Sequence, residues 1–559
     1  MQRLKLVGEA IGTEKVLVTL LPYLQEHVDD DDEILLYMAE QLGLMVPSLV
    51  PVASATMIVD ILEQLAGVEE TVVRMKAVDS LNAIIKHLDE SSVNGLKEML
   101  KRLSGAEWFT SRVSVCGLFA SVYAKTTSED VKVELRVLFK SLVEDETPMV
   151  RRSAALSLGD LTNVVSKEAV ISDMIPLFNK LVSDEQDSVR LLAVMCAQNV
   201  GKVLSTEEEN ATNLFPTIHN ACNDRSWRVR HNIAKNFVDL VTPLNFTGSN
   251  LKELIECFCV LMSDTEAEVR GASCVGLSKV ASLAGEELFL SCMLPAITPL
   301  ATDSVMDVRS KCAESCMSLL DAEAGLKLSE AVILEHLVPL LDKFLEDEFP
   351  EVQLNILRKL PSIFQLLGKT NKIVDSVTKM TEDSNWRIRQ AVATILPYFA
   401  ESLGVSQFEN SFFKAWQLLL KDQVAEVRMS VVEGVNKLSQ IAGAPWVQKK
   451  ILPTCTRIYD ESTSYLVRIT MLKLYFSLCP DESVNNLLLE EIMGLILKAL
   501  KDKVPNVRMV AARGLTKLSS FCDDVVISSQ IKPALTDTAS TDEDQDVKFF
   551  AQEALVVCS

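Results

Sequence analysis

One short pattern returns along almost the whole chain: an acidic turn, then Val or Ile, then in most copies Arg. Thirteen copies follow one another at intervals of 36 to 44 residues, most of them 39 or 40. A period of ~40 residues indicates a stack of similar units, in which each unit packs only on its neighbours. The clear copies are Val73-Arg74, Val150-Arg151, Val189-Arg190, Val229-Arg230, Val269-Arg270, Val308-Arg309, Ile388-Arg389, Val427-Arg428, Val467-Arg468 and Val507-Arg508, and the drifted ones are Ser111-Arg112, Val352-Gln353 and Val547-Lys548.

Each unit is predicted to be a pair of helices. In residues 168–201, apolar side chains recur at helical spacing on both sides of a polar turn at 183–188, as two amphipathic helices require. Pro176 lies inside the first helix, eight residues before Asp184, and this spacing recurs in four other units. Because Pro removes a backbone hydrogen bond and bends a helix, the unit resembles a HEAT repeat rather than the three-helix armadillo unit.

We therefore expect an all-α HEAT-repeat superhelical solenoid, a horseshoe of about fourteen full repeats that extends over residues 1–559 as one domain. Residues 1–11 are expected to form a second helix that ends before Gly12, so that residues 1–19 represent a truncated first repeat. We also expect the turn Asp and the recurring Arg of adjacent repeats to form a ladder. The alternative is solvated surface charge, since exposed ion pairs contribute little to stability.

Charge and composition exclude several classes of function. The net charge is −22 and no basic stripe is visible, which disfavours nucleic acid and anionic membranes as partners. The N-terminus lacks the apolar core of a signal peptide, and no apolar run approaches the ~20 residues that span a bilayer. Thirteen Cys at apolar helical positions indicate a reducing compartment, so we expect a cytoplasmic location, with the nucleus as a second one.

No motif for catalysis, cofactor binding or metal binding is present. The five His are scattered, and the chain contains no HExxH, CxxC, P-loop, GxGxxG or GxSxG motif. Cys257 and Cys259, the closest-spaced Cys, fit core positions in a helical pattern better than a metal site. We therefore expect a protein that is not an enzyme and that has no catalytic, cofactor-binding or metal-binding residues.

Three turns place Trp beside a cation on a surface that is predicted to be exposed. Trp and Arg are among the residues most enriched at binding hot spots, which favours contact with partner proteins. The alternative is that each Trp stacks on its own Arg or on the next repeat. The turns contain Trp108 and Arg112, Trp227 and Arg228, and Trp386 and Arg387, whereas Trp416 and Trp446 lie at helical positions and are expected in the core.

Beyond the period, several strings resemble one particular family, the scaffold (A, 65 kDa regulatory) subunit of type-2A protein serine/threonine phosphatases. They occur in register and in repeat order. These strings are AEQLG (39–43), VEETVVR (68–74), WFTSR (108–112), DETPMVRR (145–152), SDEQDSVRLLAV (183–194), SWRVR (226–230) and FAQEAL (550–555). The resemblance implies a non-catalytic platform without cofactors, whose turns bind an exchangeable regulatory (B-type) subunit together with a phosphatase catalytic subunit.

The resemblance also implies which repeats bind which partner. Residues 20–325 would bind the regulatory subunit, 326–366 would connect the two regions, and 367–559 would bind the catalytic subunit. The implied regulatory-subunit residues are Glu69, Glu70, Trp108, Phe109, Pro148, Arg151, Arg152, Asp187, Trp227 and Arg228. The implied catalytic-subunit residues are Trp386, Arg387, Arg389, Tyr465, Leu466, Val504, Pro505 and Asn506.

Some features depart from the family pattern, and other functions remain open. Gln353 replaces the recurring Arg, Ala425 stands where a larger contact residue is expected, and the turn at Asp460 is one residue longer than its neighbours. The main alternative is another HEAT adaptor, such as a nuclear transport receptor that binds basic cargo. An enzyme with a site hidden in the solenoid is a weaker alternative.

Overall fold

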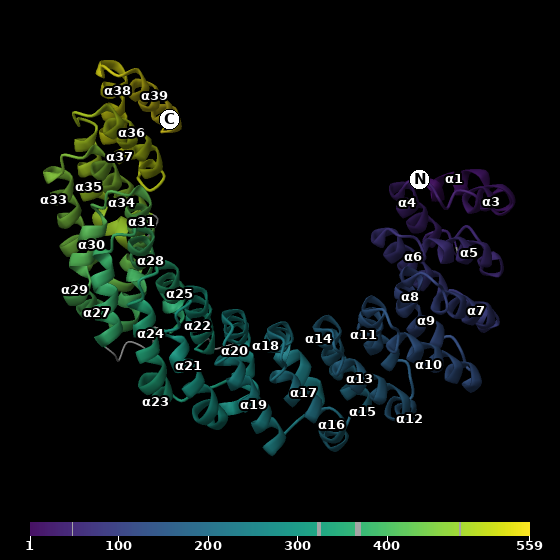
Figure 1. Cartoon of the computed structure of the whole chain (residues 1–559). Coiled ribbons are helices and arrows are strands. Elements are labelled where there is room, and N and C mark those ends of the chain that lie inside the picture. Colours follow the sequence, from purple (N-terminus) through teal and green to yellow (C-terminus); the bar gives the residue numbers. More distant parts are fainter. Residues whose placement is uncertain (47, 321–325, 364–370, 480–481, 559) are drawn as a thin grey trace. The chain divides into compact units, whose positions relative to one another are not determined.

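The computed structural model describes residues 1–46, 48–320, 326–363, 371–479 and 482–558. Every regular element in these ranges is a helix, and the predicted all-α class is confirmed. The chain forms two compact units, unit 1 (Met1–Ala296) and unit 2 (Ile297–Ser559). Within each unit, antiparallel helix pairs are stacked one after another (Figure 1).

In unit 1, first and second members of the helix pairs follow one another along the chain, and some members are divided into shorter helices. They are α1 (Leu4–Ile11), α2 (Thr13–Lys15), α3 (Leu21–Gln25), α4 (Asp32–Gly43), α5 (Thr56–Leu65), α6 (Thr71–Ile85), α7 (Val93–Ser104), α8 (Phe109–Val115), α9 (Phe119–Tyr123), α10 (Glu129–Val143), α11 (Pro148–Thr162), α12 (Lys167–Ala169), α13 (Ile175–Val182), α14 (Asp187–Met195), α15 (Ala197–Leu204), α16 (Glu207–Asn213), α17 (Phe215–Cys222), α18 (Trp227–Val241), α19 (Gly248–Met262) and α20 (Ala267–Leu288). The helix expected before Gly12 is therefore present as α1.

The same alternation continues in unit 2, and α21 (Leu294–Leu300) crosses the division in the sequence. The helices that follow are α22 (Met306–Leu319), α23 (Glu330–Val332), α24 (Val338–Leu345), α25 (Pro350–Lys359), α27 (Asn371–Lys379), α28 (Trp386–Leu403), α29 (Val405–Ser411), α30 (Phe413–Leu419), α31 (Ala425–Ala442), α32 (Ala444–Trp446), α33 (Leu452–Glu461), α34 (Tyr465–Leu478), α35 (Glu482–Ala499), α36 (Pro505–Ser519), α37 (Asp524–Val526), α38 (Lys532–Thr541) and α39 (Gln545–Val557).

Proline marks a wide helical turn in many of the first helices. A five-residue π-helical segment, such as Val170–Met174, ends two residues before Pro176, which is the second residue of α13. The same arrangement precedes Pro22, Pro295, Pro339, Pro453 and Pro533. Since Pro lacks an N–H and clashes with the preceding turn, the wider turn accommodates the ring.

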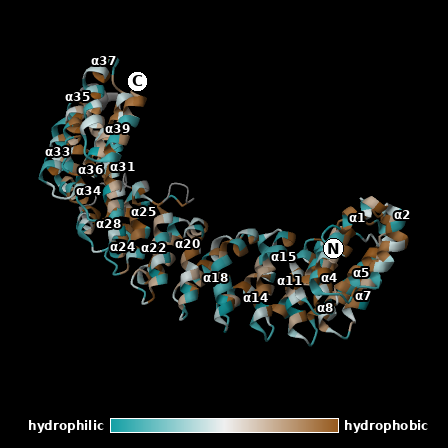
Figure 2. Cartoon of the chain, turned by 90° about the horizontal axis from the view of Figure 1, so that it is seen from above, coloured by the Kyte–Doolittle hydropathy of each residue, from teal (hydrophilic) through white to brown (hydrophobic). Residues whose placement is uncertain are grey.

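The recurring Val or Ile is the centre of each repeat's core. It is fully buried in most copies, including Val150, Val229, Val427 and Val507. Along individual helices, hydrophobic and hydrophilic residues alternate between faces (Figure 2), as packing on one side requires. Most of the Cys residues are also buried, and burial raises the pKa of the Cys116 thiol to about 12.

The predicted Arg–Asp ladder is present in both units. Arg151, for example, donates through Nε to Asp184 at 2.7 Å and through Nη1 to the carbonyls of Asp145 and Glu146. Asp184 in turn accepts from the backbone N–H of Gln186 at 2.9 Å. The described pairs have N–O distances of 2.6 to 2.8 Å and are Arg112–Asp145, Arg151–Asp184, Arg190–Asp224, Arg230–Asp264, Arg309–Asp347, Arg389–Asp422, Arg468–Asp502 and Arg508–Asp542.

The ladder is interrupted where one member of a pair is replaced. Gln353 donates to the carbonyls of Leu345 and Asp347, because its short amide cannot form the bidentate pair. Arg428 donates to Thr470 Oγ1, since Ser462 occupies the position of the ladder Asp. Burial lowers the pKa of this Arg. Arg74 is also a break: it donates to the carbonyls of Val68 and Glu69 in its own turn.

One helical stretch, Ala267–Leu300, is long and apolar enough to cross a membrane by length and composition, since an 18-residue window within it has a mean hydropathy of 1.4. It is not an uninterrupted apolar run, because Lys279, Glu286 and Glu287 lie within it. The stretch is not one regular helix, because Gly285 has a φ of +73° within it. Since the core helices of many soluble proteins have the same composition, the stretch is weak evidence for a membrane span.

The ladder predicts a pH-dependent cost for Asp224→Asn. Burial opposes ionisation of Asp224, but hydrogen bonds from Arg190 and from the N–H of Ser226 outweigh it and lower the carboxyl pKa. The ion pair therefore stabilises the fold above the ordinary Asp pKa of ~3.9, and its contribution is lost as pH falls through the lowered pKa. Because Arg190 is only 5% exposed, we expect Asp224→Asn to cost about 3 kcal/mol at neutral pH.

Urea unfolding followed by circular dichroism at neutral pH and at about pH 3 checks this. The exposed Asp239, on α18, has no ladder partner, and Asp239→Asn is the matched control. A cost for Asp224→Asn that is the same at both pH values would contradict the assignment.

The break at Arg428 predicts a stabilising substitution. Ser462→Asp would supply the missing carboxylate, and we expect it to raise the free energy of unfolding by about 1 kcal/mol, as a partly buried charge-assisted pair would. Ser462→Asn is the control, because it fills the same space without charge. Thermal unfolding of the three proteins measures the effect, and equal stability of the Asp and Asn variants would rule out completion of the ladder.

Candidate functional site: a protein-binding edge of turns

The ladder fixes the shape of each turn between paired helices. The Asp accepts from the N–H two residues later, and the Arg six residues later binds the turn carbonyls, as Asp145, Thr147 and Arg151 show. The residues two to four positions after the ladder Asp, or after Val68, Ala106 and Ser462, which take its place in their turns, are therefore held at the start of the second helix. We call these residues, together with the exposed Glu69 and Arg152 nearby in the sequence, the unit 1 edge, and their counterparts in unit 2 the unit 2 edge. Most of the residues implied by the resemblance lie there.

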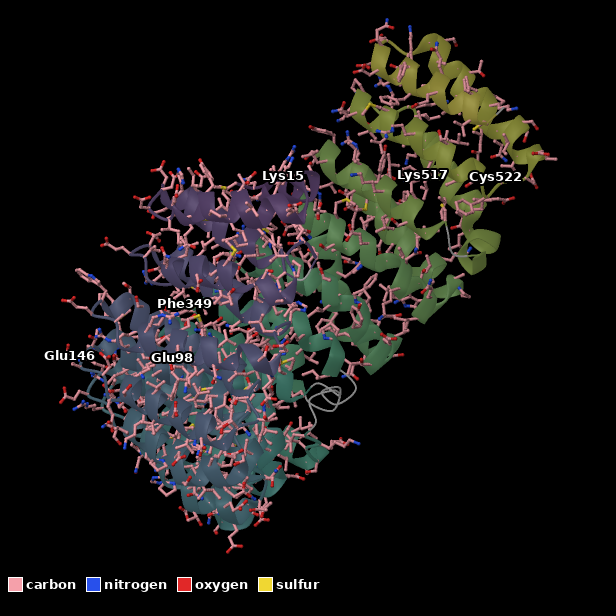
Figure 3. The ribbon with its side chains drawn as sticks, turned by 90° about the vertical axis from the view of Figure 1, so that its right-hand side faces the viewer. Lys15, Glu98, Glu146, Phe349, Lys517 and Cys522 are labelled. Carbon is pink, nitrogen blue, oxygen red and sulfur yellow. The ribbon has the colours of Figure 1, made fainter. Side chains whose placement is uncertain are left out.

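The unit 1 edge exposes large apolar side chains. Trp108 is 75% exposed, Phe109 is 40% exposed and Trp227 is 43% exposed. In the turn between α10 and α11, Glu146 projects from the outer side of unit 1 (Figure 3). Exposed aromatic groups that lie on rigid backbone lose little conformational entropy on binding, which suits them to a protein interface.

Polar contacts between neighbouring repeats order part of this edge. Asp187 accepts from Ser226 Oγ at 2.8 Å and forms an ion pair with Arg228 at 3.5 Å. Arg225 donates to the carbonyl of Glu185. Trp227 contacts His231 on its own helix in an edge-to-face arrangement. Asp187, Trp227 and Arg228 therefore form one continuous surface, and Arg228 remains exposed.

The two consecutive Arg residues in the α11 turn have different surroundings. Arg151 directs its donors to the ladder, so its position is explained by packing of the repeats. Arg152 is exposed, as is Pro148 at the start of α11. Nearer the N-terminus along the edge, Glu69 is exposed, while Glu70 caps α6 by accepting from the N–H of Val72.

In unit 2, Trp386 and Arg387 contact each other. The Arg387 guanidinium lies 4.7 Å from the centre of the Trp386 ring, so the stacking alternative considered for this turn is present in the structure. Arg387 is nevertheless exposed and Trp386 is half-buried. Both residues border a pocket of about 460 Å³, which is also lined by Arg358, Gln390 and Tyr398.

The other implied catalytic-subunit residues lie on two further turns. Tyr465 is 38% exposed and Leu466 is 44% exposed at the start of α34. Val504, Pro505 and Asn506 begin α36, where the N–H of Val504 donates to Asp502. Arg389, by contrast, pairs with Asp422 at 2.6 Å and belongs to the ladder. A direct role for each of these residues in partner binding stays a prediction.

Some edge features were not predicted from the sequence. Met149 and Phe349 are exposed at edge positions, and Arg309 lies 5.3 Å from the centre of the Phe349 ring. The sequence could have indicated both residues, because each lies two to four positions after a ladder Asp. Trp416 is buried as expected, whereas Trp446 is half-buried and donates to Glu409.

In the parts of the chain that the structure describes, no group of three or more His, Cys, Asp or Glu side chains could hold a metal ion. The shifted pKa values of residues such as Asp145 and Cys196 have structural causes, namely burial and hydrogen bonds. Burial raises the pKa of Cys196 to about 12, which makes its thiol a poor nucleophile.

A sequence model of a known family matches residues 254–541, just over half of the chain; its description is "PIK3R4-like, middle domain". Curated relatives also match parts of the chain. The regulatory A-type subunit of protein phosphatase PP2A from Schizosaccharomyces pombe is 37% identical over 43% of this chain and 41% of that protein. The beta isoform of the human 65 kDa regulatory A-type subunit of serine/threonine-protein phosphatase 2A is 36% identical over 65% of this chain and 60% of that protein.

The protein phosphatase 2A scaffold subunit of Dictyostelium discoideum is 41% identical over 32% of this chain and 30% of that protein. The chain thus covers less than two thirds of the length of each of these relatives.

Solved structures support the fold. The structure described as Kap121p bound to Ste12p has a TM-score of 0.64 and is 14% identical, over 97% of this chain and 56% of that one. The structure described as Kap121p has a TM-score of 0.63 and is 15% identical, over 97% of this chain and 56% of that one. At this identity the likeness shows the fold alone, and it confirms the predicted HEAT-repeat solenoid class.

The recurring strings, the ladder that fixes the turns and the curated relatives all agree with the resemblance found in the sequence. By the family model that matches just over half of it, the chain belongs to the PIK3R4-like middle-domain family, and it is a homologue of the regulatory A-type (scaffold) subunits of protein phosphatase 2A.

Proposed function

We propose that the chain is a non-catalytic scaffold that assembles a type-2A phosphatase catalytic subunit with an exchangeable regulatory subunit. The observation that carries the proposal is a set of turns whose aromatic and charged side chains are exposed on backbone held by the ladder. The names of the relatives, which describe regulatory and scaffold subunits of a phosphatase, support it. We propose that it acts in the cytoplasm, with the nucleus as a second location.

The unit 2 edge is the proposed contact for the catalytic subunit. Its half-buried Trp386 lies beside a pocket, so a partner side chain can pack against an aromatic wall while Arg387 supplies charge at the rim. Tyr465 and Leu466 add a second apolar contact. Large apolar groups next to a charged rim are the usual anatomy of a hot spot.

The unit 1 edge is the proposed contact for the regulatory subunit. Trp108, Phe109 and Trp227 provide apolar anchors, and Arg152 and Arg228 provide exposed positive charge. Because the chain as a whole is strongly acidic, these cations can select and orient a partner that presents acidic residues.

Such a scaffold acts by raising effective concentration. Two proteins bound to one chain meet each other as if at high local concentration, which strengthens their joint assembly without new contacts between them. A stack with contacts only between neighbouring repeats can also bend in small steps. That property would let one scaffold accommodate regulatory subunits of different shapes.

We predict that Trp386→Ala weakens binding of a purified type-2A catalytic subunit by about 2 kcal/mol or more, roughly 30-fold in Kd. The reason is the loss of an aromatic anchor on rigid backbone. Phe521→Ala is the matched control, since Phe521 is 38% exposed, the same as Tyr465, and lies outside the edge. Surface plasmon resonance with the immobilised full chain measures both variants, and circular dichroism confirms that they fold.

A Kd for Trp386→Ala within twofold of the unmodified chain would remove this turn from the interface. If the unmodified chain did not bind the catalytic subunit, the scaffold proposal would be refuted. In that case, binding of a basic localisation peptide to the same chain would support the alternative of a transport receptor.

We predict that Arg152→Glu weakens binding of a regulatory subunit but leaves catalytic-subunit binding unchanged. Arg152 is exposed on the unit 1 edge, and reversal of its charge should cost about 1 kcal/mol or more through lost attraction and new repulsion. Lys279→Glu is the control, because Lys279 is exposed on α20, twelve residues after that helix begins and so away from the turn. Pull-down with each partner separately distinguishes the two effects, and loss of both partners would contradict the division between the edges.

A further inference from the structure

A second surface in unit 2 combines a pocket with unpaired positive charge. The pocket has a volume of about 460 Å³ and lies between three consecutive second helices, α34, α36 and α39. It is lined by Lys473 and Phe476 of α34, Val510, Arg513, Gly514, Thr516 and Lys517 of α36, and Glu553 and Val557 of α39. Lys517 lies on the C-terminal helices of unit 2 (Figure 3).

The charge at this pocket is opposite in sign to that of the whole chain. Three cations, Lys473, Arg513 and Lys517, surround it with one carboxylate, Glu553. All three cations are exposed, and none forms an ion pair with a carboxylate that the structure describes. Arg513 instead lies 5.0 Å from the centre of the Phe550 ring. In a chain of net charge −22, such a cluster can attract an anionic partner to one place.

The floor of the pocket depends on a glycine. A Cβ at Gly514 would lie 1.7 Å from Cζ of Phe476, so only Gly lets this ring lie directly on α36. Gly in a helix interior costs ~1 kcal/mol relative to Ala. Phe476, Val510 and Val557 thereby form an apolar surface inside the ring of cations, a combination that suits a ligand with both an apolar and an anionic part.

This pocket is separate from the unit 2 edge. Lys517 is twelve residues after Pro505, and Phe476 is eleven after Tyr465. At 1.5 Å per residue these intervals are about 18 and 16 Å along the helices. The lining residue nearest to the edge is Val510, five residues after Pro505. From there the pocket extends toward the far end of α36, so a short segment can occupy it beyond the residues that form the edge.

We propose that this pocket binds an acidic peptide segment of a partner protein, with one large apolar side chain over Phe476 and flanking carboxylates at Lys473, Arg513 and Lys517. The volume admits a few residues rather than a folded domain. Glu553 disfavours a ligand that is negative throughout, because one side of the site repels it. The inference goes beyond the proposed scaffold function and does not depend on it.

The test is fluorescence anisotropy of a fluorescein-labelled peptide in which Glu and Asp residues flank a single Phe, titrated with the full chain. We expect binding that weakens as salt is added. A peptide with Lys in place of the acids should not bind, and one with Ala in place of Phe should bind more weakly. Lys473→Glu/Lys517→Glu should weaken binding about tenfold or more, and Glu553→Gln should strengthen it.

The matched control is Lys343→Glu/Lys414→Glu, which makes the same charge change at exposed positions on α24 and α30. Circular dichroism shows whether each variant is folded. Equal loss of binding in the two double variants would mean general charge attraction and would overturn the proposal. Absence of binding by the unmodified chain would also overturn it, as would binding of phosphatidylserine vesicles through these lysines without binding of the peptide.

Discussion

The bidentate pair between an Arg of one repeat and an Asp of the next is the interaction on which the other features depend. The guanidinium binds its own turn through two carbonyls and the following turn through a carboxylate, as Arg151 does. Both partners lie at the margin of the core, where removing one would leave an uncompensated charge. The pair therefore couples the shape of a turn to the stacking of the next repeat. The exposed edge residues take their positions from that coupling.

The sequence was sufficient to predict the fold, because the pattern that indicates it occurs in many copies. Helical spacing, the buried Val and the ladder Asp each occur in many copies, so chance variation in one copy does not hide the pattern. The exposed Trp108 and Trp227 followed from the same register. The pocket lined by Phe476 could not be predicted, because it requires three helices to meet and depends on a single close approach at Gly514. Likewise, only coordinates show that Arg387 stacks on Trp386.

The comparisons separate what a helical-repeat fold explains from what particular residues explain. Karyopherin structures share the fold at 14–15% identity, so stacking of helix pairs does not distinguish a transport receptor from a phosphatase subunit. The relatives at 36–41% identity are regulatory or scaffold subunits. The proposals for the two edges therefore concern the few side chains on each turn.

The interruptions at Arg74, Gln353 and Arg428 also have a mechanical meaning. A chain of units joined by nearest-neighbour contacts behaves under load like springs in series, and the most compliant joint extends first. Where Arg428 has only the Thr470 hydroxyl as its partner in the next repeat, the joint between repeats lacks its bidentate pair. Tension applied to the two ends of such a molecule would first separate the repeats at these interrupted positions. A bound partner that deformed the stack would likewise produce the largest change at these contacts between repeats.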